Sequence, residues 1–315
     1  MGRIVVGVDG GGTRTRIAAL DVSTNKTVSF SECGSIHTLD HGVGEAAKRL
    51  EGGIAALGLS PSDEIAAIAV GDPALDDSDP GAGEPFRSAL RDIFGSGCRV
   101  YSTSDVFMAL YAFSRGKPAA LIVSGTGSMG AALIGDLDFK TAPRVVTVGG
   151  WGEPSRDPGS GYRVGVDSVS AALDAFDGVG EPTSLCEAAL AYFGAASPRD
   201  LVGIFNPDPP PRAFIAGFAR ETERRALAGD AVALRTLKRA GEALGNYAVS
   251  LLKRLDPGGL RLGCYGGLVT NCGIVRDAME ARVRESFPGV SVSVPDIPAH
   301  IGAALFAADA LESEE

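Results

Sequence analysis

The sequence predicts an α/β protein made of two related domains. Residues 4–21 have the pattern of an apolar strand, a glycine turn opened by an acid, and a second strand. Residues 119–134 repeat this strand, turn and strand about one domain length further along the chain. At 315 residues the chain is long enough for about two domains, each with its own hydrophobic core.

The first glycine turn is typical of a phosphate-binding loop. Because three consecutive glycines have no Cβ, their backbone N–H groups can converge on phosphate oxygens and take positive φ angles. Asp9, where the first strand ends, is a hard oxygen ligand that suits Mg²⁺ directly or through water. An ordinary glycine-rich β-hairpin is the alternative, since Asp-Gly is a strong hairpin signal by itself. The predicted nucleotide contacts of this turn are Gly10, Gly11 and Gly12, with Thr13 and Thr15 as hydroxyl donors.

Two further glycine turns extend this prediction. Chance hairpins explain one such loop better than two, so the repeat favours two domains that each offer a loop to one nucleotide. A third turn would let the backbone pass beneath an adenine or the adenosine sugar, with a plain strand-to-helix turn as the alternative. The predicted nucleotide contacts are Ser124, Gly125, Thr126 and Gly127 in the second turn, and Gly266, Gly267 and Asn271 in the third.

Hydrophobic periodicity predicts the remaining elements. In the first part of the chain we expect strands at 4–8, 15–20, 27–31, 65–70 and 99–102 and helices at 45–57, 84–94 and 105–114. In the second part, which is mostly helical, we expect helices at 213–227, 230–255, 274–284 and 299–311 and a strand at 290–294. Residues 72–83 form an acidic Pro/Gly loop that we expect to be mobile.

In this order and spacing, the three glycine turns resemble those of the actin, hexokinase and heat-shock ATPase superfamily. Within it the chain resembles the BadF/BadG/BcrA/BcrD-type ATPase family, specifically its N-acetylglucosamine kinase branch. The most specific part of this resemblance, which runs nearly end to end, is Gly149-Gly150-Trp151-Gly152 followed by Gly159-Ser160-Gly161-Tyr162. It implies two ribonuclease-H-like (actin-like ATPase) domains with an interdomain nucleotide cleft. The domains would comprise residues 1–117, completed by the C-terminal helix 299–315, and residues 118–298.

Asp105 is the predicted catalytic base. Phosphoryl transfer to an alcohol depends on positioning and charge neutralisation, helped by a carboxylate that accepts the hydroxyl proton. Asp105 follows a short strand at the start of a helix, and it matches the family's catalytic aspartate. The alternative role is a helix N-cap, since Ser and Asp both cap helices well.

The resemblance also implies which residues hold the acceptor sugar. A carboxylate such as that of Asp157 can anchor two neighbouring hydroxyls, with an exposed loop aspartate as the alternative. Trp151 would give an apolar wall to a sugar ring, or it would be an indole packed in the core. The predicted set is Asp105, His37, Gly150, Trp151, Asp157 and Thr126.

Two departures from the family pattern bear on which sugar is bound. His37 stands where the acetylglucosamine kinases have a sugar-holding asparagine, and Pro158 stands where many relatives have a second acid. A pocket built on different polar groups can reject one sugar and accept another, because unpaired buried donors are costly. A hydroxyl acceptor is expected in either case.

Composition excludes several other functions. The net charge is −10, from 29 basic and 39 acidic residues, and without a basic block nucleic acid is not an expected partner. No apolar run reaches the roughly 18 residues of a membrane span and no signal-peptide pattern is present, so we expect a cytosolic protein. The cysteines are scattered, which argues against disulfides, structural zinc and an iron–sulfur cluster.

Together these features predict a kinase that uses ATP and Mg²⁺ to phosphorylate a hexose or amino sugar, such as N-acetylglucosamine, glucosamine or a glucose-like sugar. One alternative is an ATPase module of the BadF/BcrA type that drives a conformational change in a partner protein. Another is a sugar sensor without turnover, against which the intact Asp9, Asp105 and Thr126 argue. Relatives are often dimers, so a homodimer is one of the expected states.

Overall fold

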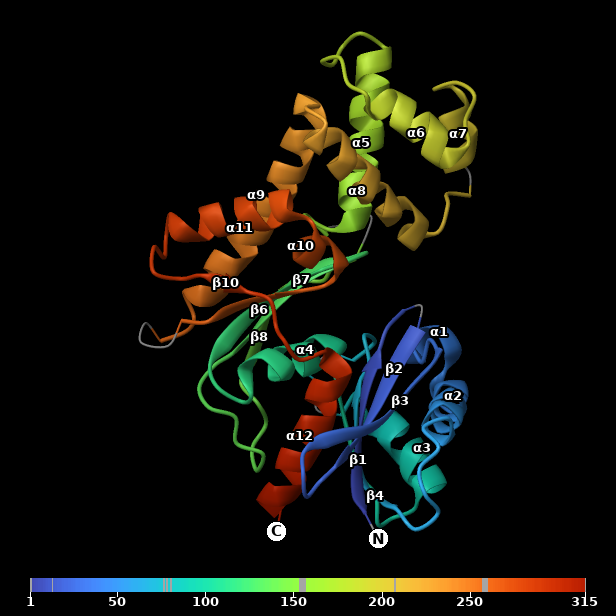
Figure 1. The fold of residues 1–315 in the computed structure, drawn as a ribbon, viewed down its shortest axis with the longest axis vertical. Helices are drawn as coiled ribbons and strands as arrows, with labels where there is room; N and C mark the ends of the chain where they lie inside the picture. The colour runs from blue at the N-terminus through green and yellow to red at the C-terminus, as the bar shows by residue number, and fades with distance from the viewer. Residues whose placement is uncertain are drawn as a thin grey trace. The chain divides into compact units, whose positions relative to one another are not determined.

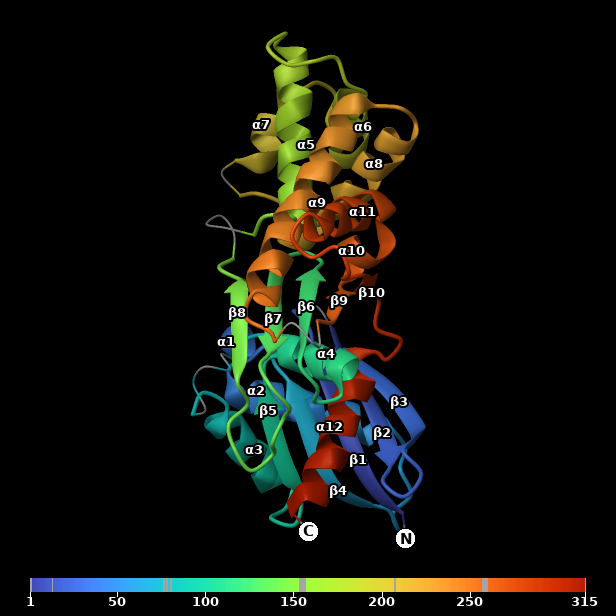
Figure 2. The same cartoon turned by 90° about the vertical axis from the view of Figure 1, so that its left-hand side faces the viewer.

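The computed structural model describes residues 2–12, 14–75, 77, 79, 81–152, 157–206, 208–256 and 260–314. The chain divides into two compact units (Figures 1 and 2). Unit 1 comprises Met1–Ala119, Ala131–Val146 and Pro295–Glu315, and unit 2 comprises Ala120–Gly130 and Thr147–Val294. The C-terminal segment therefore belongs to the same unit as the N-terminal strands.

Unit 1 is built on a five-stranded sheet with the order β3-β2-β1-β4-β5. Antiparallel pairing joins β1 (Arg3–Gly10), β2 (Arg14–Asp21) and β3 (Lys26–Gly34), while β4 (Glu64–Gly71) and β5 (Arg99–Thr103) continue the sheet in parallel with β1. Because β1, β4 and β5 are parallel, their carboxyl ends meet at one edge of the sheet. Ligands of open α/β sheets bind at such an edge.

Helices cover both faces of this sheet (Figure 1). The hydrophobic core on one face includes α2 (Val43–Ala55) and α3 (Glu84–Phe94), and the core on the other includes α4 (Asp105–Ser114) and α12 (Ala299–Glu314). Alternation along β1 explains the two cores, since Val6 and Val8 enter the first and Val5 enters the second. A short helix, α1 (Thr38–His41), precedes α2.

The C-terminal helix α12 lies directly on β1 and α4 because glycines occupy the contact points. A Cβ at Gly7 would overlap the backbone of α12 and lie 2.7 Å from Ala304 Cα. A Cβ at Gly302 would lie 2.7 Å from Ala112 Cα in α4. Phe306 adds edge-to-face contacts with aromatic rings of α4. The last helix of the chain is therefore part of the core of unit 1.

A second five-stranded sheet repeats the topology of the first. It contains β6 (Ala119–Ser124), β7 (Ser128–Leu133), β8 (Val145–Gly149), β9 (Leu262–Tyr265) and β10 (Val292–Ser293) in the order β10-β9-β6-β7-β8. If the strands of each sheet are numbered along the chain, the first sheet read from β3 and the second sheet read from β8 both have the order third, second, first, fourth, fifth. The repeat seen in the two glycine hairpins is thus present in the topology, and the predicted α/β fold class is confirmed.

Unit 2 adds a set of helices to its sheet. They are α5 (Gly161–Phe176), α6 (Leu185–Phe193), α7 (Asp200–Phe205), α8 (Arg212–Leu227), α9 (Ala231–Leu252), α10 (Gly267–Asn271) and α11 (Gly273–Arg284). Helix α9 packs on the sheet, since a Cβ at Gly149 would lie 2.5 Å from Tyr247 Cε2. Helix α11 packs closely on α9, where a Cβ at Gly241 would overlap Val275 O.

Some elements differ from the sequence-based expectation. β10 has 2 residues and is therefore shorter than the strand predicted at 290–294. The sequence did not predict β8, α5, α6 and α7 as individual elements. Helix α9 starts after Asp230, whose carboxylate caps it by accepting the N–H groups of Val232 and Ala233. β8 and α5 escaped prediction because both border the glycine-rich stretch at 149–161, where local propensity is weak.

Burial makes three of the cysteines unreactive. Desolvation raises the pKa of the thiols of Cys98, Cys264 and Cys272 to about 11. They therefore stay protonated at neutral pH and pack as small apolar residues. Among the residues that the structure describes, no helix combines the length and the apolar character needed to cross a membrane.

The contact between α12 and β1 can be tested with two Gly→Ala substitutions. Gly7→Ala should lower the free energy of unfolding by roughly 1–3 kcal/mol or more, because the added methyl group forces α12 away from β1. Gly52→Ala is the matched control, since Gly52 lies within α2 and no atom stands within 4 Å of its Cβ position. It should raise stability by roughly 0.5–1 kcal/mol through helix propensity. Chemical denaturation measures both, and a Gly7→Ala protein as stable as the wild type would contradict the contact.

Candidate functional site

The first glycine turn lies at the carboxyl end of β1, where glycine is required by close contacts. A Cβ at Gly10 would lie 2.6 Å from Gly71 O, and a Cβ at Gly11 would lie 2.8 Å from Arg14 O. The φ angles of Gly10 and Gly11 are not positive, so the expected positive φ is not the reason for these two glycines. Gly12 has open space around its Cβ position. Thr13 lies outside the described residues.

The sequence predicts Thr15 as a hydroxyl donor of this turn, but its hydroxyl does not reach the surface of the turn. It pairs with Gly10 across β1 and β2 and with Cys33 across β2 and β3. Its side chain is fully buried on the side of the sheet that α2 covers, beside the thiol of Cys33. Alternation along β2 directs this hydroxyl into the core.

Asp105 is the first residue of α4, and only Ser104 separates it from the end of β5. The N-cap is Ser104, whose Oγ accepts the N–H of Phe107 at 3.0 Å. The capping role that sequence left open for Asp105 therefore belongs to its neighbour. Asp105 Oδ1 instead accepts the N–H of Val106 at 2.8 Å. A Cβ at Gly71 would lie 2.9 Å from Asp105 Cα, so glycine at the end of β4 lets α4 begin this close to the sheet edge.

The electrostatic environment of Asp105 is strongly negative. Burial, the charge of Asp9, and the charges of Asp72 and Asp77 raise the pKa of Asp105 to about 7, while the N–H of Val106 acts in the opposite direction. Asp9 belongs to this group because it lies on the same face of β1 as Val5, and this is the face of the sheet that α4 covers. A half-buried carboxyl with a pKa near neutrality is suited to accept a proton.

Two acids of this cluster were not predicted as site residues. Asp72 is fully buried; its Oδ2 accepts Thr38 Oγ1 at 2.6 Å and its Oδ1 accepts the N–H of Ala74 at 2.9 Å. Asp77 accepts the N–H and the hydroxyl of Ser104. The expectation of a mobile loop is therefore wrong for Asp72, which these contacts hold in place. Its position directly after a buried parallel strand was the signal in the sequence that pointed to this edge.

His37 lies next to the same edge, in the turn before α1. The preceding residue, Ile36, is fully buried and contacts the Cβ position of Gly10 at 3.1 Å. The imidazole is half-buried, and its Nδ1 lies 3.3 Å from Asp40 Oδ2 without hydrogen-bond geometry. Unit 1 thus brings the predicted residues Asp9, Gly10, His37 and Asp105 to one edge of its sheet.

The second glycine turn is held by the start of α5. The N–H of Gly161 donates to Gly125 O at 2.7 Å, and the N–H of Tyr162 donates to Thr126 O at 3.3 Å. The hydroxyls of the two flanking serines are used for support as well, since Ser124 Oγ donates to Gly159 O at 2.7 Å and Ser128 Oγ donates to Pro158 O at 2.8 Å. Thr126 at the tip of the turn is exposed, so its hydroxyl is accessible from solvent.

Asp157 is an internal support of this turn. It is 4% exposed, which excludes an exposed loop aspartate. It accepts the N–H of Gly152 at 3.2 Å and Arg212 Nη2 at 3.2 Å, and its Oδ2 would lie 2.9 Å from a Cβ at Gly127. Burial raises the pKa of Asp157, while the Gly152 N–H and Arg212 oppose this shift.

Trp151 is exposed on unit 2. Its exposed fraction of 75% excludes the core indole that sequence left open. The flanking Gly150 has a φ of 73°, a conformation that favours glycine, and its N–H donates to Ser128 O at 3.1 Å. The indole lines a pocket of about 490 Å³ together with Pro158 and Tyr247.

The third glycine turn lies against the second. Gly266 has a φ of 99°, and a Cβ there would lie 2.5 Å from Ser124 O, so only glycine fits. Gly267 follows at the start of α10, and Asn271 at its end donates its side-chain N–H to Gly267 O at 2.8 Å. The two turns predicted for phosphate and for adenosine are therefore neighbours within unit 2.

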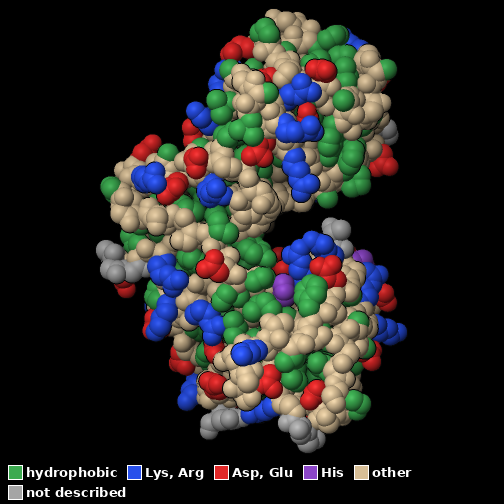
Figure 3. All heavy atoms as spheres, in the orientation of Figure 1, with side chains coloured by type: hydrophobic (Ala, Val, Ile, Leu, Met, Phe, Trp, Pro, Cys, Tyr) green, Lys and Arg blue, Asp and Glu red, His purple; other side chains and the backbone are tan. Residues whose placement is uncertain are grey.

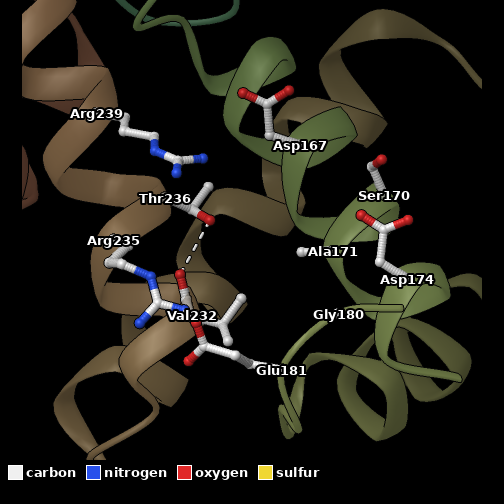
Figure 4. A pocket seen from close by; sticks show the side chains of 10 residues that line it. All are labelled: Asp167, Ser170, Ala171, Asp174, Gly180, Glu181, Val232, Arg235, Thr236 and Arg239. Carbon is white, nitrogen blue, oxygen red and sulfur yellow. Dashed lines mark hydrogen bonds and ion pairs between the residues drawn. The ribbon is translucent and has the colours of Figure 1, made fainter. Parts of the chain in front are cut away.

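Two other surfaces carry no sign of a site. A pocket of about 400 Å³ between α5 and α9 (Figure 4) contains none of the predicted residues. Several of its charged residues are paired, Arg235 with Glu181 at 2.8 Å and Asp167 with Arg163 at 2.7 Å. On the face drawn in Figure 3, Lys and Arg are interspersed with Asp and Glu, and the described side chains there form no continuous basic surface.

Known proteins of the same overall length are similar to this chain. It is 26% identical to an N-acetyl-D-glucosamine kinase of Dictyostelium discoideum, over 96% of this chain and 97% of that protein. It is also 26% identical to an N-acetylmuramic acid/N-acetylglucosamine kinase of Clostridium acetobutylicum, over 92% of this chain and 93% of that protein.

Solved structures share the fold. A putative N-acetylglucosamine kinase from Porphyromonas gingivalis superposes with a TM-score of 0.75 at 18% identity, covering 98% of this chain and 99% of that one. At this identity the likeness concerns the fold alone. The sequence pattern of the BadF/BadG/BcrA/BcrD ATPase family matches residues 6–307, and this chain therefore belongs to that family.

Proposed function

We propose that this protein is an ATP-dependent kinase that phosphorylates a hydroxyl group of a hexose or amino sugar of the N-acetylglucosamine, glucosamine or glucose type. The observation that carries the proposal is the environment of Asp105, a carboxyl with a pKa of about 7 beside the first glycine turn. Membership of an ATPase family supports ATP use. Relatives named as amino-sugar kinases support a sugar as the acceptor.

In this reaction Asp105 accepts the proton of the attacking hydroxyl. A base works best when its pKa is close to the working pH, because it is then both ionised and sufficiently basic. Burial and the neighbouring carboxylates bring Asp105 to this range. The amino end of α4 and the Val106 N–H limit the shift, since both stabilise the ionised form.

We propose that the glycine turns, taken within each unit separately, are the nucleotide-binding elements. In unit 1 we assign the backbone N–H groups of Gly10, Gly11 and Gly12 to phosphate oxygens. The Thr15 hydroxyl is not part of this assignment, because it is buried. In unit 2 we assign the exposed Thr126 and the backbone of its turn to phosphate, and the backbone at Gly266 and Gly267 to adenosine. Backbone N–H groups in such turns are suited to anions because they carry partial positive charge and leave room for close approach.

Asp9 is the residue that would hold Mg²⁺. Its carboxylate provides the oxygen ligands that this ion prefers, and it belongs to a cluster whose mutual repulsion a cation would relieve. Mg²⁺ is commonly bound by one or two carboxylates together with substrate phosphates and water, so phosphates and water would complete its coordination. When bound, the ion would neutralise charge on the transferred phosphoryl group.

For the acceptor sugar we propose His37 and Asp105 within unit 1 and, separately, Gly150, Trp151 and Asp157 within unit 2. The exposed indole of Trp151 offers the apolar surface that a sugar ring needs. Asp157 already accepts bonds from Gly152 and Arg212, but a carboxylate has about four acceptor positions and retains capacity for a hydroxyl.

Sugar-dependent ADP release tests the proposal. With ATP and Mg²⁺, one sugar of a panel of glucose, glucosamine, N-acetylglucosamine and N-acetylmuramic acid should raise ADP release well above the level without sugar, and the phosphorylated sugar should be detectable by mass spectrometry. Equal release with and without every sugar would refute the kinase and favour an ATPase module that acts on a protein partner.

Replacement of Asp105 tests its role as the base. Asp105→Asn keeps the shape of the side chain and removes its basicity, so kcat should fall about 10²–10⁴-fold. Affinity for the nucleotide, measured by titration calorimetry, should stay within about threefold of the wild type. Turnover at the wild-type rate would remove Asp105 from the mechanism.

The same variant should be more stable than the wild type at alkaline pH. Because the pKa of Asp105 is raised from 3.8 to about 7, the folded state binds its proton more tightly than the unfolded state does, and stability falls as pH rises through this range. Asp105→Asn lacks this loss. In EDTA its free energy of unfolding should exceed that of the wild type by about 1 kcal/mol or more at pH 8, with the gain absent at pH 3.5.

The matched control is Asp79→Asn, which changes an exposed acid of the loop after β4. It should show no such pH-dependent gain. A loss of stability in Asp105→Asn at pH 8 would instead indicate that Asp105 serves mainly to stabilise the start of α4.

A further inference from the structure

A fully buried carboxylate at the candidate site, whose charge helps to raise the pKa of Asp105, also makes contacts that the reaction described so far does not use. Asp72 has an exposed fraction of 0% and follows Gly71 at the end of β4. Its Oδ2 accepts the hydroxyl of Thr38 at 2.6 Å, and its Oδ1 accepts the N–H of Ala74 at 2.9 Å. Its own N–H donates to Thr103 O at 2.9 Å. Burying a charge is costly unless it is well paired, so these contacts account for its presence here.

These contacts join two segments that the proposed reaction needs together. Thr103 is the last residue of β5 and stands two residues before Asp105. Thr38 is the first residue of α1 and directly follows His37. Asp72 therefore contacts both segments, the turn at His37 through its carboxylate and the end of β5, just before the base, through its backbone N–H.

The turn at His37 has local contacts, since the His37 N–H donates to Ser35 Oγ at 3.2 Å and Arg49 Nη1 donates to Ser35 O at 3.1 Å, but the helix that follows it is short. Helix α1 has 4 residues, its N-cap is His37, and no side chain caps it. A helix this short is unstable without tertiary contacts. Thr38 Oγ1 provides a side-chain bond from this helix to the sheet edge, and it ends on a charged acceptor, which makes the bond stronger than one between neutral groups.

We propose that Asp72 is a positioning residue for the phosphoryl acceptor, which fixes Thr38 and with it the His37 turn at a set distance from Asp105. This inference rests on the proposed function. It assigns the pair of Asp72 and Thr38 to the positioning of the phosphoryl acceptor. Asp72 does not touch the acceptor itself. The acceptor hydroxyl would meet the base in the correct orientation only while the His37 turn is held, because small misplacements at a reacting centre are costly.

A second acid of the same loop supports this interpretation. Asp77 accepts the backbone N–H of Ser104 at 2.8 Å and also accepts its hydroxyl. Ser104 in turn caps α4 directly before Asp105. One loop thus uses one carboxylate to hold the turn of His37 and another to hold the helix of the base.

The test compares two substitutions of Thr38 with one of Asp72. Thr38→Val keeps the shape and removes the hydroxyl, Thr38→Ser keeps the hydroxyl, and Asp72→Asn removes the charge. In the sugar-dependent ADP release assay, Thr38→Val and Asp72→Asn should each lower kcat/KM for the sugar about tenfold or more. KM for ATP should stay within about twofold, and Thr38→Ser should recover most of the activity.

A double substitution identifies the pair as the unit that acts. If the bond between Thr38 and Asp72 carries the effect, Thr38→Val combined with Asp72→Asn should cost little more than either change alone. Asp79→Asn, an exposed acid in the same loop, is the matched control and should leave all kinetic constants unchanged. Hydrogen exchange should be faster at residues 37–41 in Thr38→Val and unchanged at α12.

Each outcome decides between the two proposals. Wild-type protein without sugar-dependent ADP release would overturn the kinase and this inference together. Sugar-dependent release in the wild type, with Thr38→Val as active as Thr38→Ser, would overturn the positioning role alone. A Thr38→Val protein that loses affinity for ATP and sugar equally, with a lower Tm, would assign the bond to general stability and would also overturn it.

Discussion

Close backbone contact at the carboxyl edge of the first sheet is the constraint on which the candidate site depends. Gly10 lies against the carbonyl of Gly71, and Gly71 lies against Cα of Asp105, at separations that a Cβ would not allow. The first glycine turn, the end of β4 and the start of α4 are therefore adjacent with no side chain between them. The N-cap hydrogen bond of Ser104 and the hydrogen bond between Thr38 and Asp72 stabilise this arrangement.

This geometry gathers negative charge, and the charge is what makes the edge chemically useful. Several carboxylates surround Asp105 and, with burial, raise its pKa to about 7. The cluster opposes folding, because each ionised group is repelled by the others. Sites that retain such unfavourable arrangements are commonly functional, since a cation or a substrate proton can relieve them. The fold tolerates this cluster because the core around β1, α4 and α12 is closely packed.

In unit 2, hydrogen bonds hold the second glycine turn in place while its tip stays exposed. The hydroxyls of Ser124 and Ser128 and the carboxylate of Asp157 all point to neighbouring backbone or to Arg212. Residues that sequence marked as ligands thus serve partly as supports, and this distinction is invisible in a motif. Thr126, at the tip, remains exposed. A turn supported from below in this way can present its N–H groups and hydroxyl without rearrangement.

The sequence by itself determined the α/β class, the internal repeat and the glycine turns, because strand periodicity and glycine runs are local signals. Asp105 became the candidate base through its match with the family's catalytic aspartate. Tertiary structure alone decided that the Thr15 hydroxyl is buried, that Trp151 is exposed, that Ser104 rather than Asp105 is the cap, and that Asp72 is bonded to Thr38. These depend on which sheet face a residue takes and on contacts between segments far apart in the chain. Local sequence carries no record of such contacts, since they form only when the parallel strands bring their carboxyl ends to one edge.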